Sequence, residues 1–174
     1  MCKMGRLLSV IEGTMASVSQ FNADLELQHI YLEVYAERYH HLKAFVEAYY
    51  CFTHGAVTKN DKPDWEAIFD TGLRTTQSCG VMDRKLLVRD MLVPFSVLVG
   101  MMKVMVRDAD LTIDGLRQLL DEKLQYVILT RVEYSKLVKQ GLKEAMPAGF
   151  YQTNSHYYQQ NTARYDVADI TLVE

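Results

Sequence analysis

Apolar side chains recur every three to four residues over most of this chain, which is the spacing of one face of an α-helix. Sustained alternation of apolar and polar residues, the pattern of a half-buried strand, is nearly absent. Glycine and proline are scarce, with 9 and 3 among 174 residues. We therefore predict an all-α fold, a bundle of about five helices in residues 1–149. A non-helical tail rich in aromatic and amide side chains follows at residues 150–174.

Start and stop signals divide the bundle into helices. Pro63 can occupy the first turn of one helix, and Pro94 predicts a kink or a break just before it in another. Thr112 is a suitable N-cap, while Pro147 and Gly149 limit the last helix. The expected helices cover residues 3–12, 24–53, 63–73, 83–107 and 112–145.

The composition is that of a folded globular protein, with 49% hydrophobic and 24% charged residues. The net charge of −3 excludes an overall polycation directed at nucleic acid. The cysteines, 3 in number and without a close pair, favour a reducing compartment. The longest uncharged apolar run, residues 91–102, is shorter than the roughly 20 residues of a membrane-spanning helix. We expect a cytoplasmic protein with no membrane segment.

Two Glu-x-x-His pairs, Glu26 with His29 and Glu37 with His40, have the spacing found in di-iron helical bundles. In such bundles the pairs come from different helices, whereas both pairs here lie on one predicted helix. They are separated along it by roughly 16 Å at 1.5 Å per residue. The metals of a two-metal site lie about 4 Å apart. A dimeric helical metalloenzyme therefore stays only as a second alternative.

Other signals for a metal or for catalysis are weak. Cys51 and His54 form a single ligand pair, and nothing in the spacing of Cys2, Cys79 or His156 completes a set of four. The chain contains no Gly-x-Ser-x-Gly nucleophile motif and no glycine-rich phosphate-binding motif. We predict a protein that is not an enzyme and has no metal or cofactor.

The basic residues are unevenly distributed. Lys123, Arg131, Lys136, Lys139 and Lys143 share their segment with Glu133 as the only acidic residue. If the helix continues to residue 145, the last three lysines lie within about a 60° arc. Such a stripe can follow a phosphate backbone, or it can be a solvated face near a helix C-terminus, where the helix dipole favours cations.

Two arginines interrupt apolar helix faces in the predicted pattern. Arg38 falls within the aromatic face of the 24–53 helix, and Arg131 falls at the centre of the apolar face of the last helix. An unpaired buried guanidinium is strongly unfavourable. Either both arginines meet buried carboxylates, or these faces are open to a partner. In the tail, residues 150–160 interleave aromatics with amides, which favours packing or docking over base stacking.

The segment 37–55, ERYHHLKAFVEAYYCFTHG, resembles the Arg-Tyr, Glu-Ala and aromatic helix of small subunits of CRISPR interference complexes. The likeness covers this segment alone, which lies here in the first third of the chain. It implies a compact helical subunit that lines a larger complex and contacts nucleic acid without catalysis. It also implies that Arg38 is a candidate backbone contact.

We therefore expect a non-enzymatic helical subunit of a multi-protein, nucleic-acid-binding complex, most concretely a CRISPR effector small subunit. Its candidate nucleic-acid-binding residues are Arg38, Arg131, Lys136, Lys139 and Lys143. The partners would be other protein subunits and a nucleic-acid backbone. The alternative is a protein-only interaction or adaptor module of a phage or host-defence system.

Overall fold

The computed structural model describes the backbone of residues 5–173 and the side chains of residues 18–173. The chain divides into two compact units, residues 1–67 and 68–174. The prediction of an all-α fold is wrong. The described residues form a three-stranded mixed sheet as well as seven α-helices, and all three strands belong to the second unit.

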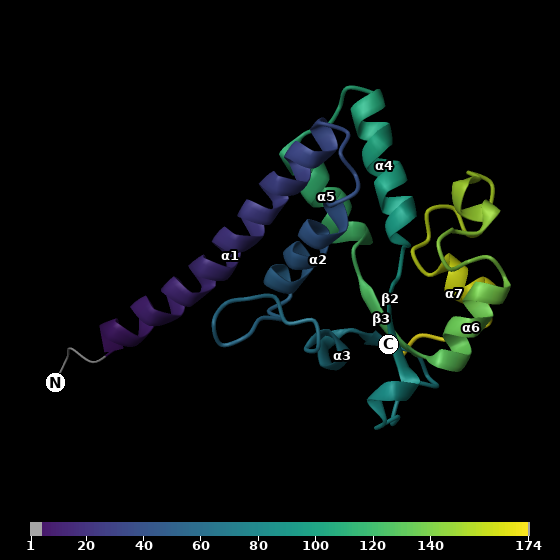
Figure 1. Ribbon diagram of the computed structural model, residues 1–174, viewed down its shortest axis with the longest axis horizontal. Helices are drawn as coiled ribbons and strands as arrows, with labels where there is room; N and C mark the ends of the chain where they lie inside the picture. Colours follow the sequence, from purple (N-terminus) through teal and green to yellow (C-terminus); the bar gives the residue numbers. More distant parts are fainter. Residues whose placement is uncertain (1–4, 174) are drawn as a thin grey trace. The chain divides into compact units, whose positions relative to one another are not determined.

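The first unit is an antiparallel helical hairpin of α1 (Gly5–Tyr35) and α2 (Leu42–Thr53) (Figure 1). One face of α1 is buried at intervals of three and four residues, and α2 is buried mainly through apolar and aromatic side chains. The Ser19 hydroxyl donates to the carbonyl of Phe52 at 2.8 Å, so α2 ends level with Ser19. The buried residues of α1 are Ala23, Leu27, Ile30 and Val34.

The helix predicted at residues 24–53 is interrupted between α1 and α2. The backbone N–H of Glu37 donates to Val34, and that of Arg38 donates to Glu33, which together form a Schellman motif. Glu37 takes the left-handed conformation that this motif requires, with φ of 55°. Glycine usually occupies that position. The sequence therefore lacks the residue that would have marked the break.

The second unit contains a small sheet with strand order β1-β3-β2. Its strands are β1 (Leu73–Arg74), β2 (Leu87–Met91) and β3 (Tyr126–Thr130), and the short 3-10 helix η1 (Arg84–Leu86) leads into β2. β3 pairs in parallel with β1 and antiparallel with β2. A very short α3 (Ile68–Thr71) precedes β1, in place of the longer helix predicted from Pro63.

The two faces of the sheet have different cores. Val127 and Leu129 pack with Leu137, Leu142 and Tyr165 on one face. On the other, Ile128 packs with Phe69 and Leu87. Consecutive residues of β3 thus face opposite layers, as the pleat of a strand requires.

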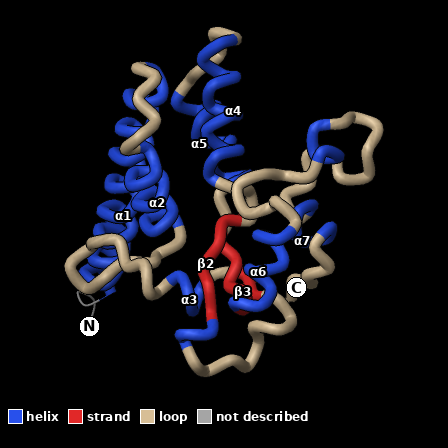
Figure 2. Tube along the Cα trace, turned by 45° about the vertical axis from the view of Figure 1, so that its right-hand side comes forward, coloured by secondary structure: helices blue, strands red, loops and turns tan. Residues whose placement is uncertain are grey.

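Antiparallel strands β2 and β3 are joined by a pair of helices, α4 (Phe95–Arg107) and α5 (Ile113–Lys123) (Figures 1 and 2). The helix predicted at residues 83–107 is wrong before Pro94, where η1 and β2 take its place. The predicted break before Pro94 is confirmed, because α4 begins at Phe95 with Pro94 as its N-cap. The N-cap at Thr112 is also confirmed, since its hydroxyl accepts a hydrogen bond from the Gly115 N–H at 3.0 Å.

The long helix predicted at residues 112–145 is wrong. It is replaced by α5, then β3, then α6 (Arg131–Lys139). α6 begins with a capping box between Thr130 and Glu133 and is followed by Gly141, whose φ is 71°. The apolar run Tyr126–Leu129 is continuous, and periodicity alone does not distinguish such a buried strand from a buried helix.

The C-terminal segment is integrated into the second unit, and the prediction of a non-helical tail is wrong. It contains the 3-10 helix η2 (Ala148–Tyr151) and the short α7 (Ala163–Val167). Tyr165, Ala168 and Ile170 belong to the core on one sheet face. Thr75 and Leu172 form an isolated antiparallel bridge. Among the helices described, none has the length and apolar character needed to cross a lipid bilayer.

Candidate binding groove

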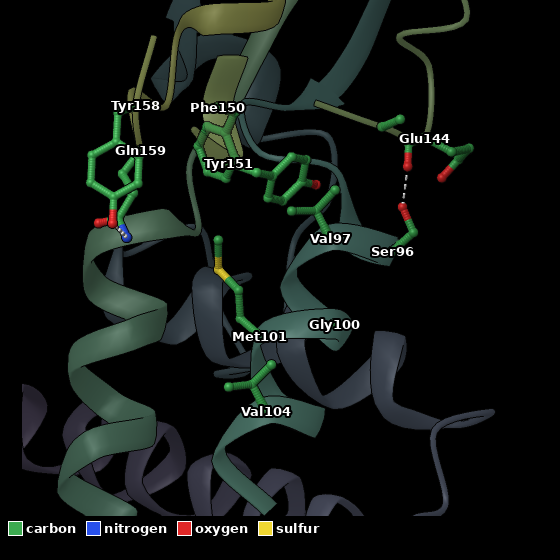
Figure 3. A pocket seen from close by; sticks show the side chains of 11 residues that line it. Ser96, Val97, Gly100, Met101, Val104, Glu144, Phe150, Tyr151, Tyr158 and Gln159 are labelled. Atoms are coloured by element: carbon green, nitrogen blue, oxygen red, sulfur yellow. Dashed lines mark hydrogen bonds between the residues drawn. The ribbon is translucent and has the colours of Figure 1, made fainter. Parts of the chain in front are cut away.

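A groove of about 560 Å³ opens in the second unit between α4 and the C-terminal segment (Figure 3). This volume falls within the usual size of small-molecule pockets, about 300–1,000 Å³. Its lining is dominated by aliphatic and aromatic side chains. The lining residues are Ser96, Val97, Gly100, Met101, Val104, Glu144, Ala145, Phe150, Tyr151, Tyr158 and Gln159.

One wall of the groove is a single face of α4. Val97, Gly100, Met101 and Val104 follow one another at helical spacing of three, one and three residues and so share a side of the helix (Figure 3). A Cβ atom built on Gly100 would meet no heavy atom within 4 Å. Glycine therefore leaves open space in the middle of this wall.

The opposite wall comes from the aromatic part of the tail. The Phe150 ring is buried, and it packs in a cluster with Met146 and Ala163. Tyr151 and Tyr158 are exposed at the groove. The Gln159 backbone N–H donates to the Phe150 carbonyl at 3.0 Å, which closes the loop that carries both tyrosines. The sequence expectation of a packed or docked aromatic tail thus has a structural counterpart in this wall.

Arg164 fixes the segments from which both walls start. Its side chain is completely buried. Nε donates to the Leu92 carbonyl at 3.0 Å, just before α4, and Nη1 donates to the Leu142 and Lys143 carbonyls at 2.9 and 3.2 Å. Nη2 donates to the Met91 carbonyl. One guanidinium therefore holds together the end of β2 and the chain leading to Glu144.

The charge of Arg164 is balanced by Asp90. Nη2 donates to Asp90 Oδ2 at 2.5 Å, and the Tyr165 hydroxyl donates to the same oxygen at 3.0 Å. Burial raises the pKa of Asp90, although the Arg164 charge and both hydrogen bonds oppose this shift. Burial, followed by the neighbouring Asp90 charge, raises the pKa of Tyr165 well above its ordinary value. The cluster is a rigid, mostly buried support for the groove.

Two further contacts hold the walls. The Ser96 hydroxyl at the start of α4 donates to the Glu144 carbonyl, as Figure 3 shows. Lys123, buried at the end of α5, donates to the Asn161 side-chain oxygen at 3.0 Å and lies 3.4 Å from the Gln159 carbonyl. The groove is thus bounded by anchored backbone on both sides.

The predicted nucleic-acid-binding residues are not gathered at this groove. Arg38 belongs to the first unit, where it follows α1, and its exposed guanidinium donates to Glu33 Oε1 at 2.6 Å. It interrupts no aromatic face, because the helix has ended before it. The remaining candidates are in the second unit, on α6 and just beyond it.

The cations near α6 are exposed or half-buried on the surface of the second unit. Arg131 Nε donates to the Lys85 carbonyl at 2.5 Å, and Lys136 Nζ lies 3.4 Å from the Asp169 carbonyl. Lys139 ends α6, so Lys143 is outside the helix, where it lies 3.6 Å from Glu144. The common 60° arc predicted for three lysines is therefore wrong for Lys143.

The side chains considered as metal ligands are dispersed over the described part of the chain. His29 Nδ1 lies 3.2 Å from Glu26 Oε2, while His40 is in the turn after α1. Cys51 is buried and Cys79 is exposed, and both are free thiols. Within the described part of the chain, no group of three or more histidine, cysteine or acidic side chains is arranged to hold a metal ion.

Sequence reasoning did not identify Arg164 or Asp90 as partners. The sequence signal that could have indicated a buried arginine is that Arg164 lies near Ala163, Tyr165 and Ala168, which are apolar or aromatic. Its partner is 74 residues away, which local periodicity does not reveal. Comparisons of the chain with protein-family models, with curated proteins and with solved structures give no significant match.

Proposed function

We propose that this protein is a non-catalytic interaction subunit whose groove holds an apolar segment of a partner protein. The proposal follows the protein-only alternative drawn from the sequence. It rests chiefly on Gly100, which leaves open space between the apolar α4 face and the exposed tyrosines. A cytoplasmic location is part of the same proposal.

Glycine at position 100 has a measurable disadvantage in a helix. In a helix interior it is less favourable than alanine by about 1 kcal/mol. The space around it would accept a Cβ without a clash, so packing within the chain does not require glycine. A partner backbone that crosses α4 at this point would require it, because only glycine allows such a close approach.

The chemistry of the lining defines the partner segment further. Val104, Tyr151 and Tyr158 provide exposed apolar and aromatic surface at the groove. Glu144 is the only charged side chain in the lining. An occupant with one or two large apolar residues next to a lysine or arginine would complement both features. Tyrosine-rich surfaces of this kind are common at protein interfaces.

A pair of substitutions at Gly100 tests the proposal. Gly100→Leu should fill the groove, whereas Gly100→Ala adds only one methyl group and should leave it open. The probe is a displayed library of random 12-residue peptides, selected on the wild-type protein with the Gly100→Leu protein as counter-target. Affinities of the enriched peptides are then measured for both variants by fluorescence anisotropy.

We expect enriched peptides that combine large apolar residues with a basic residue. Their affinity should fall at least tenfold for Gly100→Leu and stay within threefold for Gly100→Ala. Circular dichroism checks that both variants keep the wild-type helix content. If no peptide distinguishes the wild-type protein from Gly100→Leu, the proposal is wrong.

The second candidate function is contact with a nucleic-acid backbone by the cations near α6, as in the CRISPR small subunits that residues 37–55 resemble. Its support is that the hydrogen bonds of Arg131 and Lys136 go to neutral carbonyl oxygens, so these contacts do not neutralise their charges. Binding of a labelled single-stranded RNA or DNA should weaken with salt. The combined change Lys136→Glu, Lys139→Glu and Lys143→Glu should flatten that salt dependence. An unchanged slope excludes this candidate.

A further inference from the structure

α1 has a second apolar face that α2 does not cover. Its large hydrophobic side chains are exposed, while the residues that are buried against the hairpin core lie on another side of the helix. The exposed side chains, with their exposed fractions, are Val18 (39%), Phe21 (66%), Leu25 (38%), Leu32 (57%) and Tyr35 (69%).

These residues follow a heptad repeat. Val18, Leu25 and Leu32 are seven residues apart, as are Phe21, Gln28 and Tyr35, which fall at the d positions when the first set is placed at a. In the sequence, the same register continues toward the N-terminus through Met4, Leu7, Ile11 and Thr14. Within the described side chains, residues 18–35, five of the six a and d positions are apolar and Gln28 is the polar one, which is the spacing of a coiled-coil seam.

The buried face occupies the opposite side of the same helix. Ala23 and Ile30 fall at f positions, and Leu27 and Val34 fall at c positions. The f position is directly opposite the a/d seam of a heptad. A partner helix could therefore cover the exposed seam while the α1–α2 hairpin remains intact.

The length of α1 also calls for a partner. α1 has 31 residues and α2 has 12, and α2 ends level with Ser19. At about 1.5 Å per residue these lengths are roughly 46 Å and 18 Å. Figure 1 shows α1 continuing well beyond the end of α2. Helices depend mostly on tertiary packing for their stability in water, so a helix that continues this far beyond α2 calls for packing that α2 does not supply.

We infer that α1 pairs with α1 of a second copy of this chain in a parallel, two-stranded coiled coil. A heptad seam complements a copy of itself, and a twofold interface of this kind is the most frequent in oligomers. In the parallel register Gln28 faces Gln28 of the partner subunit, so each side-chain amide meets both a donor and an acceptor. A polar pair in the seam fixes the register.

The flanking polar residues agree with the parallel arrangement. Asp24 occupies a g position and His29 occupies the following e position. In parallel coiled coils a g residue approaches the next e residue of the other helix. Asp24 would therefore approach His29 of the partner subunit. Both residues are half-buried on α1, beside the exposed seam.

Light scattering after size-exclusion chromatography tests the pairing. The wild-type protein should have twice the 20.0 kDa mass of one chain. Leu25→Lys places a charge in the seam and should give the mass of one chain at the same concentration. Gln20→Lys is the matched control, because it adds the same charge at an exposed position outside the seam and should leave the mass doubled.

Cross-linking tests the orientation in a Cys2→Ser, Cys79→Ser background. Gln28→Cys and Tyr35→Cys, introduced singly, should each give a disulfide-linked dimer on a non-reducing gel, while Gln20→Cys should not. An antiparallel pair can bring at most one of the two d positions next to the same position of the other chain.

A wild-type protein that keeps the mass of one chain up to a concentration of about 100 µM would overturn the inference, because a stable coiled-coil dimer has a dissociation constant well below that concentration. A doubled mass that Leu25→Lys leaves unchanged would overturn it as well.

Discussion

Arg164 Nη2 donates to Asp90 Oδ2 at 2.5 Å and joins two residues that are 74 positions apart in the chain. The same guanidinium is bonded to the carbonyl groups of Leu92 and Leu142, which precede the groove residues of α4 and Glu144 in the chain. All three of its nitrogen atoms therefore have acceptors inside the second unit, which is what a fully buried guanidinium requires. The pair connects the stability of the fold to the geometry of the proposed binding site.

Replacing Arg164 should strongly destabilise the second unit. Arg164→Met keeps much of the side-chain volume but leaves the Asp90 carboxylate without its cationic partner and several carbonyl groups without their donor. Breaking a buried pair in this way costs about 3–5 kcal/mol of unfolding free energy. Urea unfolding followed by circular dichroism measures the change. Lys139→Met, on the exposed end of α6, is the control and should shift the free energy by less than about 0.5 kcal/mol. A loss below 1 kcal/mol for Arg164→Met would contradict the assigned role.

Tyr165 should make stability depend on alkaline pH. Its pKa is raised in the folded state, chiefly by burial. A raised folded pKa gives a stabilising contribution that is complete below the unfolded pKa of about 10 and is lost as the pH rises beyond it. Between about pH 9 and 11 the wild-type protein should therefore lose more unfolding free energy than Tyr165→Phe. Chemical unfolding at several pH values measures this difference. The same change of unfolding free energy with pH in both proteins would contradict the prediction.

Replacing Glu37 with glycine should stabilise the protein. Its left-handed conformation, with φ of 55°, is unfavourable for a residue with a Cβ atom. Glu37→Gly should raise the unfolding free energy by about 0.5–1 kcal/mol, because relief of this strain exceeds the added freedom of the unfolded chain. Ala44→Gly within α2 introduces the same residue at a helical position and should lower it by about 1 kcal/mol. A destabilised Glu37→Gly protein would show that the Schellman turn is not retained.

Glu133 should stabilise the fold through the hydrogen bonds of its side chain more than through its charge. Oε2 accepts from the Thr75 hydroxyl at 2.8 Å and from the N–H and hydroxyl of Thr130 at 2.8 and 2.9 Å. Glu133→Leu leaves these three donors without their acceptor and should cost at least about 3 kcal/mol, at about 1–3 kcal/mol for each donor. Glu133→Gln retains an acceptor oxygen and should cost less than half as much. Thermal unfolding compares the two, and equal losses would contradict the prediction.

Local signals predicted several helix limits from the sequence. Thr112 caps α5, α4 begins directly after Pro94, and the end of α4 at Arg107 agrees with the predicted limit. The rules behind these signals depend on the residue itself, such as a missing proline N–H or a hydroxyl that can accept a hydrogen bond. They do not depend on what the helix packs against.

Non-local pairing could not be predicted in this way. β3 is a short, continuous apolar run, and its partners β1 and β2 come from earlier parts of the chain. Of the groove, the sequence indicated the aromatic wall from residues 150–160 but not the α4 wall or the Arg164 support. The sequence predicted one helix at residues 3–12 and another from residue 24, whereas α1 is continuous from Gly5 to Tyr35, so the heptad spacing along it was not identified.

The bridge between Thr75 and Leu172 has a consequence for biosynthesis. A ribosome that adds about 5–20 residues per second reaches Leu172 roughly 5–20 s after it has passed Thr75. During that interval β1 lacks this bridge, and until residue 164 has been added the end of β2 lacks its hydrogen bonds from Arg164. The first unit, whose residues are translated earlier, can form its hairpin in the meantime. A nascent chain stalled before residue 164 should therefore expose an incomplete second unit to chaperones and proteases.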